Sequence, residues 1–145
     1  MKLELHATPE EVMRAVETLE QFALANGVPE KDVFGLTLSL EECGANVVNH
    51  ALQGDARQTF QVVIEMQADV LVIELRDRGP EFDPTAAAER PLQADDDDLP
   101  GGWGIQLVRR YTDEVRYTRL AGENILRLAK RIAPSDPSEP PASPE

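Results

Sequence analysis

Residues 59–77 read TFQVVIEMQADVLVIELRD, two apolar runs on either side of Ala68 and Asp69. Apolar and polar residues alternate within these runs with the period of two that a half-buried strand shows. Both runs are rich in β-branched residues, which favour strands, and a short break between such runs is typical of a hairpin. The stretch therefore predicts two antiparallel strands and, with them, a sheet that is at least partly antiparallel.

The flanking segments predict further strands and helices. Residues 8–27 read as a helix: Thr8 caps it, Pro9 lies in its first turn, Glu11 completes a capping box and Gly27 ends it. Strands and helices do not alternate strictly, so a doubly wound parallel sheet is not expected. The order predicts an α+β two-layer sandwich, a mostly antiparallel sheet with helices on one face. The other predicted elements are helices at 29–52 and 104–114 and strands at 2–6, 113–120 and 124–132.

Length and composition predict one domain and a tail. The chain has 145 residues, which suits a single domain, expected at residues 1–132. Residues 133–145 contain five prolines and predict a disordered tail. The single cysteine, Cys43, allows no internal disulfide and is expected to be a buried core residue.

Charge and hydropathy limit the classes of partner. The formal net charge is −13, from 27 acidic and 14 basic residues, and such a surface repels nucleic-acid phosphates and anionic membranes. No stretch approaches the roughly 20 apolar residues that a membrane-spanning helix needs, and the first residues do not read as a signal peptide. We therefore expect a cytoplasmic protein that binds neither nucleic acid nor membrane directly.

The first polar cluster is LSLEECGANVVNHA, residues 38–51, within the second predicted helix. Glu42 and Asn46 are four residues apart and lie on one helix face. Polar groups on a helix that packs against a sheet cost free energy unless a polar partner meets them. The alternative is a solvated stripe with an ordinary contact between the two side chains.

The second cluster is DRGPEFDP, residues 77–84, directly after a predicted buried strand. The Asp77 carboxylate can accept a hydrogen bond from an amino group. Gly79 lets the backbone approach a flat ligand, and Phe82 can pack under the loop. The alternative is a polar turn that ends the hairpin.

The third cluster is PGGWGIQLVRR, in which Gly101, Gly102 and Gly104 precede the third predicted helix. Backbone N–H groups at a glycine-rich helix start can bind an anion. The chain contains neither the phosphate-loop pattern nor the dinucleotide pattern. The cluster alone is weak evidence for a phosphate site.

Together the three clusters resemble the ATP-binding fold that gyrase, Hsp90, histidine kinases and MutL share, the Bergerat or GHKL fold. In detail they look like the anti-sigma-factor serine/threonine kinases of bacterial stress-response and sporulation circuits. The resemblance covers roughly residues 5–132. It implies ATP and Mg²⁺ as cofactors.

The resemblance also implies roles for the first cluster. Asn46 would hold Mg²⁺ through its side-chain oxygen, and Glu42 would orient or deprotonate the attacking hydroxyl. His50 matches a family position near the phosphates, although a histidine at a helix end is equally often structural.

For the other two clusters the resemblance implies a base site and a phosphate site. Asp77 would accept the exocyclic amine of adenine, and Glu123 and Asn124 lie where the family often has a polar residue near adenine. The residues expected around the rest of the nucleotide are Gly79, Phe82, Gly101, Gly102, Gly104 and Ile105, with residues 85–100 as a lid and Arg109 as a surface cation.

The implied function is a partner switch. The protein would bind and inhibit an RNA polymerase sigma factor, and would phosphorylate a serine of an anti-anti-sigma (STAS-domain) protein with Mg-ATP. Family members commonly form homodimers, so a homodimer is expected. The alternative is a regulatory module of the same fold that binds ATP or ADP without transferring phosphate.

Overall fold

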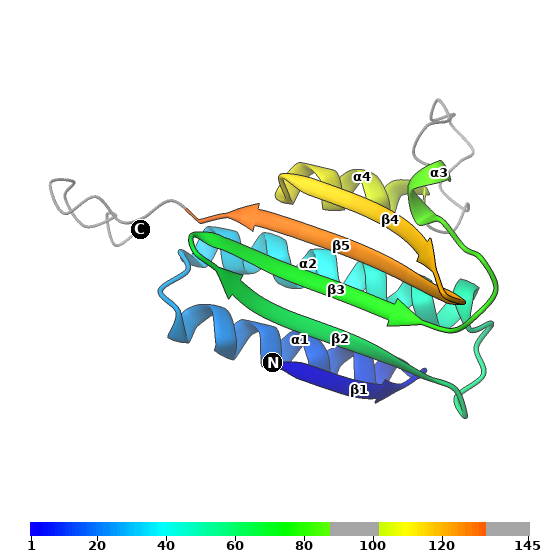
Figure 1. Ribbon diagram of the computed structural model, residues 1–145. Coiled ribbons are helices and arrows are strands. Elements are labelled where there is room, and N and C mark those ends of the chain that lie inside the picture. The colour runs from blue at the N-terminus through cyan, green and yellow to red at the C-terminus, as the bar shows by residue number, and fades with distance from the viewer. Residues whose placement is uncertain (88–101, 133–145) are drawn as a thin grey trace, which may run out of the picture.

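The computed structural model describes residues 1–87 and 102–132. The predicted tail and most of the predicted lid lie outside the described residues. In chain order the elements (Figure 1) are β1 (Lys2–His6), α1 (Pro9–Ala25), α2 (Glu30–Asn46), the π-helical turn η1 (Val47–Ala51), β2 (Thr59–Gln67), β3 (Val70–Asp77), α3 (Pro84–Ala87), α4 (Gly102–Tyr111), β4 (Glu114–Leu120) and β5 (Glu123–Arg131).

The five strands form one sheet in the order β1-β2-β3-β5-β4, and every neighbouring pair is antiparallel. Helices α1, α2 and α4 lie on one face of this sheet, behind the strands in Figure 1. The predicted α+β two-layer sandwich is therefore confirmed. The hairpin that the 59–77 stretch predicts is β2 and β3, which pair from Phe60 with Asp77 to Gln67 with Val70.

The core lies between the sheet and the helices. Alternate residues of β3 point into it, and Leu71, Ile73 and Leu75 are at most 1% exposed. They meet apolar side chains such as Leu19 of α1 and Leu40 of α2 in one hydrophobic cluster. This burial of apolar area is the main force that holds the helices on the sheet.

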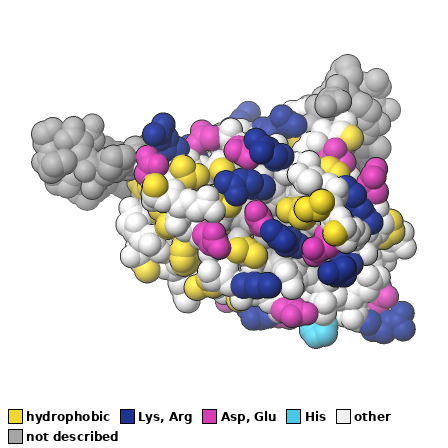
Figure 2. Space-filling view, viewed as in Figure 1, with side chains coloured by type: hydrophobic (Ala, Val, Ile, Leu, Met, Phe, Trp, Pro, Cys, Tyr) yellow, Lys and Arg dark blue, Asp and Glu magenta, His cyan; other side chains and the backbone are white. Residues whose placement is uncertain are grey.

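The other face of the sheet is open and charged. Figure 2 shows basic and acidic side chains interspersed over the strands on this face. Glu74 of β3 pairs with Arg76 at 2.8 Å and lies 3.8 Å from Arg127 of β5. Since such half-exposed pairs contribute little stability, this face reads as a solvated surface.

The first helix begins as its sequence predicts. The Thr8 hydroxyl accepts a hydrogen bond from the Glu11 backbone N–H at 3.2 Å, and Pro9 is the first helical residue. The Glu11 carboxylate in turn accepts from the His6 N–H at 3.2 Å. After the helix, Gly27 adopts a left-handed φ of 75°, a conformation that glycine takes at little cost.

Three details of the helices differ from the prediction. The second helix was predicted to continue to Leu52, but its last turn is π-helical: the Leu52 N–H donates to the Val47 carbonyl, five residues back, at 2.8 Å. Pro84–Ala87 form the short helix α3, for which no apolar pattern exists. Helix α4 begins at Gly102, two residues before the predicted start. No helix in the described ranges has the length and apolar character needed to cross a bilayer.

Candidate functional site

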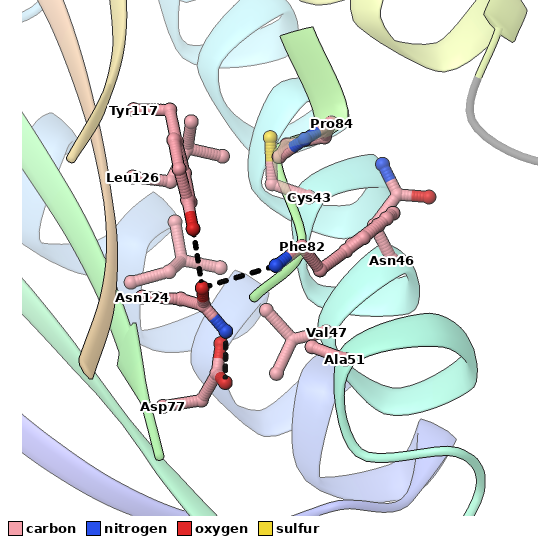
Figure 3. A pocket seen from close by; sticks show the side chains of 11 residues that line it. Cys43, Asn46, Val47, Ala51, Asp77, Phe82, Pro84, Tyr117, Asn124 and Leu126 are labelled. Atoms are coloured by element: carbon pink, nitrogen blue, oxygen red, sulfur yellow. Dashed lines mark hydrogen bonds between the residues drawn. The ribbon is translucent and has the colours of Figure 1, made fainter. Parts of the chain in front are cut away.

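A small pocket lies between α2, the η1 turn and the ends of strands β3, β4 and β5. Figure 3 shows its side chains converging from these elements and from the loop after β3. The cavity measures about 20 Å³, roughly the room that one water molecule needs. The lining residues are Cys43, Asn46, Val47, Ala51, Leu75, Asp77, Phe82, Pro84, Tyr117, Asn124 and Leu126.

Asp77 ends β3 at the floor of the pocket and is 4% exposed. Its Oδ1 accepts hydrogen bonds from the Gly79 N–H at 2.9 Å and from Asn124 Nδ2 at 2.8 Å. Burial raises the pKa of the Asp77 carboxyl above its usual value, and these two hydrogen bonds oppose the rise. None of the hydrogen bonds in the described part of the chain ends on Oδ2, so this oxygen is available to a further donor.

Asn124 connects the parts of this end of the pocket. It faces Asp77 in the β3–β5 register, and its side chain is 4% exposed. Its Nδ2 donates to two oxygens and its Oδ1 accepts from three donors, so the amide is fully hydrogen-bonded (Figure 3 draws three of these bonds). The donations go to Asp77 Oδ1 and the Pro80 carbonyl, both at 2.8 Å; the acceptances come from Tyr117 Oη at 2.5 Å, Arg119 Nη1 at 3.1 Å and the Phe82 N–H at 3.2 Å.

Gly79 packs against the η1 turn. A Cβ at this position would meet the Ala51 carbonyl oxygen at a separation that real Cβ atoms essentially never show. Arg119 also donates to the Gly79 carbonyl at 2.7 Å. The sequence predicted that this glycine leaves room for a ligand, but in the structure the space is needed for backbone of the protein itself.

Asn46 lies at the opposite end of the pocket, on the last turn of α2. The residue is 8% exposed, and its Nδ2 is buried without a hydrogen-bond partner among residues 1–87 and 102–132. Native proteins rarely leave a buried polar atom unpaired, and such an atom often marks a ligand or an ion that completes it. The rings of His50 in η1 and Phe82 pack against each other nearby, with centroids 5.4 Å apart and planes tilted by 44°.

Glu42 and Cys43 lie near Asn46 on α2, but only one of them lines the pocket. Glu42 lies one helical turn before Asn46 and is half-buried, but it does not line the pocket. Cys43 does line the pocket and is fully buried, and this burial raises the pKa of its thiol to about 12. The thiol therefore stays protonated, which confirms its prediction as a core residue.

The third cluster is only partly described. Gly102 and Gly104 lie within the first turn of α4, so the prediction that they precede the helix is wrong, and Gly101 lies outside the described residues. Ile105 is fully buried, and Arg109 is exposed, as a surface cation should be. The structure therefore brings Asn46, Asp77 and Phe82 into one pocket but does not test the phosphate site.

Two observations bear on how the pocket could hold a metal ion. In the described part of the chain, no three His, Cys, Asp or Glu side chains gather into a metal site. Mg²⁺ needs only one or two protein oxygens, because waters and substrate phosphates supply its other ligands. Asn46 offers one such oxygen, Oδ1, whereas its unpaired Nδ2 is a hydrogen-bond donor that suits a phosphate oxygen rather than a cation.

Sequence reasoning missed Tyr117 and Arg119, which hold Asn124 and the loop after β3. Both lie on one face of β4, two residues apart, as an ordinary edge strand would place them. Their roles follow from the pairing of β4 with β5, so no local sequence signal marks them.

The chain matches a known domain family and a known protein kinase. The model of the histidine kinase-like ATPase domain family matches residues 5–130. The chain is 32% identical over 133 residues to the serine/threonine-protein kinase BtrW of Bordetella bronchiseptica, covering 91% of this chain and 94% of that protein.

Solved structures share the fold. The crystal structure of the RsbU and RsbW domains of Rv1364c from Mycobacterium tuberculosis aligns with a TM-score of 0.64 at 18% identity, over 91% of this chain and 32% of that longer chain. The SiaB–SiaC complex from Pseudomonas aeruginosa aligns with a TM-score of 0.66 at 14% identity, over 89% and 88% of the two chains. These matches confirm the predicted GHKL-type fold.

The resemblance inferred from the three clusters is thus confirmed, and with it, at the level of the family, the prediction of an ATP-dependent serine/threonine-protein kinase. The chain belongs to the histidine kinase-like ATPase domain family.

Proposed function

We propose that the pocket binds Mg-ATP and that the chain transfers a phosphoryl group to a serine of an anti-anti-sigma STAS-domain protein. One observation carries the proposal: a buried amide without a partner, on Asn46, lies in the same pocket as the buried carboxylate of Asp77. Asn46, with Oδ1 for the metal and Nδ2 for a phosphate oxygen, would form the phosphate end of one nucleotide site, and Asp77 would form the base end.

Asp77 would bind the base. Its Oδ1 is used by Gly79 and Asn124, and its Oδ2 can accept the exocyclic amine of adenine. Guanine has a carbonyl oxygen at that place, which a carboxylate repels. Asn124 would act as a positioning residue, because it holds the Asp77 carboxylate in one orientation.

The pocket must open to admit a nucleotide. Its present volume of about 20 Å³ is far below the ~300 Å³ or more of ordinary ligand pockets. Phe82 lines the cavity and rests on His50, and the loop that carries it is held mainly by Asn124. We therefore propose that the Phe82 side chain moves aside and then covers the bound base.

Glu42 would act as the base in phosphoryl transfer. It lies on the same side of α2 as Asn46, one turn away, so a serine hydroxyl placed near the metal-bound phosphate would be within its reach. When bound, Mg²⁺ neutralises charge on the phosphate oxygens. The chain's own contributions are then a proton acceptor at Glu42 and a fixed amide at Asn46.

The partners are part of the proposal. The RsbW-type and SiaB-type neighbours share the fold, and the kinase relative covers nearly the whole chain, which supports a partner-switching kinase. In this scheme the protein acts in the cytoplasm as a homodimer. It holds a sigma factor while the anti-anti-sigma protein is phosphorylated, and the net charge of −13 favours a basic sigma surface.

The test uses radiolabelled ATP and the cognate anti-anti-sigma protein. The wild-type chain should label a serine of that protein, and Glu42→Ala should lower the rate at least about 100-fold while ATP binding stays within about twofold. Glu65→Ala is the matched control, because Glu65 is an exposed carboxylate on the open face of the sheet. Nucleotide binding without any labelling by the wild-type chain would instead support a binding module.

A further inference from the structure

The outward surface of α1 and α2 carries two parallel stripes of exposed side chains. On each helix the members recur at intervals of four, three and four residues, so each stripe runs along one side of its helix. The stripe of α1 is Met13, Glu17, Glu20 and Leu24, and that of α2 is Glu30, Phe34, Thr37 and Glu41. All of these side chains are exposed except Thr37, which is partly buried.

Two hollows lie along the groove between the stripes. The larger, of about 300 Å³, is lined by Leu24, Val33 and Phe34 together with Glu20 and Glu30. The smaller, of about 180 Å³, lies toward the other end of the groove and is lined by residues that include Met13, Val48 and Glu41. Both hollows therefore combine apolar walls with carboxylates.

The groove concentrates apolar side chains that a solvated helix pair does not need. The described residues contain five large apolar side chains that are strongly exposed, and three of them lie here: Phe34 at 62%, Leu24 at 49% and Met13 at 42%. Contiguous exposed apolar surface with a polar rim marks interaction sites on soluble proteins.

Charge identifies the kind of partner. The titratable side chains that line the two hollows are all glutamates, with no lysine or arginine among the lining residues. Arg14, the nearest base on α1, pairs with Glu11 of the same helix at 2.7 Å and donates to the Glu4 carbonyl of β1. A ligand of this groove must therefore be basic as well as apolar.

The distance between the two hollows indicates the shape of the ligand. Met13 and Leu24 are eleven residues apart on one helix, which separates the two hollows by about 16 Å, or three helical turns. We propose that the α1–α2 groove binds an amphipathic helix of a partner protein, with apolar residues about eleven positions apart and lysines or arginines beside them. A helix laid in a groove between two helices is a common mode of peptide recognition.

A second copy of this chain fits the groove less well. A two-fold contact of groove on groove would place glutamates against glutamates, and facing like charges cost free energy. The two hollows also share no lining residue with the nucleotide pocket. The proposal therefore does not rest on the proposed function.

The test measures peptide binding by fluorescence anisotropy with the full nucleotide-free chain. The probe is a synthetic 18-residue helix with leucines on one face, two of them eleven residues apart, and lysines beside them. A shuffled peptide of the same composition, with leucines all around, keeps the charge but loses the apolar face. The ordered peptide should bind at least tenfold more tightly than the shuffled one.

Variants locate the site. The double variant Leu24→Ser with Phe34→Ser should weaken the ordered peptide at least tenfold, whereas Leu120→Ser, at an equally exposed leucine of β4, should change nothing. Glu20→Gln with Glu30→Gln should lower both the affinity and its salt dependence. Circular dichroism checks that each variant is folded.

Three results would overturn the proposal. They are equal binding of both peptides, no binding of the ordered peptide, and unchanged binding by the Leu24 and Phe34 double variant. Self-association of the chain that the same double variant abolishes, seen by sedimentation, would assign the groove to a second copy instead.

Discussion

The two ends of the proposed nucleotide pocket are built in opposite ways. At the base end, Asn124 makes five hydrogen bonds and Asp77 Oδ1 accepts two, so the Asn124 amide is satisfied without a ligand. At the phosphate end, Asn46 presents a buried Nδ2 that has no partner among the described residues. Both side chains are amides that are less than 10% exposed, so burial alone does not explain the difference.

The comparison separates stability from binding. A saturated amide contributes to folding whether or not a nucleotide is present, because its removal leaves several buried partners unsatisfied. An unpaired amide contributes little to folding and gains its partner only when a ligand arrives. Substitutions at the two ends should therefore divide between effects on the free energy of unfolding and effects on nucleotide affinity.

The largest effect on stability is expected from Asn124→Ala. Each buried group that loses its hydrogen bond costs about 1–3 kcal/mol, and water can satisfy some of them, so we expect a loss of about 3 kcal/mol in the free energy of unfolding. Urea denaturation of the nucleotide-free chain measures it, with Thr118→Ala on β4 as a near-neutral control. A loss below about 1 kcal/mol would show that the network does not stabilise the base end.

Gly79→Ala should have the next largest effect. The added methyl would press on the Ala51 backbone carbonyl, which cannot rotate away as a side chain could, so we expect a loss of about 2 kcal/mol. Gly54→Ala is the matched control: its φ of 73° is strained for alanine, at about 1 kcal/mol, but its surroundings are open. Only Gly79→Ala should also weaken nucleotide binding, because it alone displaces the loop of Phe82.

What the sequence predicts well is local. Thr8 and Glu11 announce the start of α1, and the alternation in residues 59–77 predicts the β2–β3 hairpin, because capping and side-chain period depend on neighbours in the chain. Asp77 was found as a candidate for the same reason, since a carboxylate directly after an apolar strand is visible in sequence.

What the sequence does not predict depends on pairing between distant segments. Asn124 meets Asp77 only because β3 and β5 pair in one register, and Gly79 is constrained by Ala51, 28 positions earlier. The η1 turn has no sequence signature, because a single π-helical turn is too short to show an apolar period of its own. These are the features that shape the pocket.

Asn46→Ala tests the phosphate end. Since Nδ2 has no partner to lose among the described residues, the free energy of unfolding should change by less than about 1 kcal/mol. The affinity for Mg-ATP should fall about tenfold, as is usual when a metal site loses an interaction, while the affinity for ATP without metal should fall less, because only Oδ1 would act on the metal. Isothermal titration with and without Mg²⁺ measures both. Equal losses in the two titrations would assign Asn46 to the nucleotide rather than to the metal.

Asp77→Asn should have the smallest effect on the free energy of unfolding, and the size of this effect should depend on pH. Burial raises the pKa of Asp77 in the folded state above the value near 3.9 that an unfolded aspartate has, so the folded protein binds the proton more tightly. The contribution of this group to stability is then fully present below the unfolded pKa and is lost as pH rises through the folded pKa. The Asp77→Asn variant carries no such charge, so its free energy of unfolding should rise relative to that of wild type as pH increases from the unfolded to the folded pKa.

Urea denaturation of wild type and Asp77→Asn between pH 3.5 and pH 7 isolates the contribution of Asp77. The other titrating groups are common to both proteins, so they cancel in the difference between the two free energies of unfolding. The difference should grow with pH and then become constant above the folded pKa of Asp77. A difference that falls with pH would mean that the hydrogen bonds from Asn124 and Gly79 outweigh burial. The hydrogen-bond donors at the base end would then favour the ionised carboxylate of Asp77. The contrast between this paired carboxylate and the unpaired amide of Asn46 would be larger.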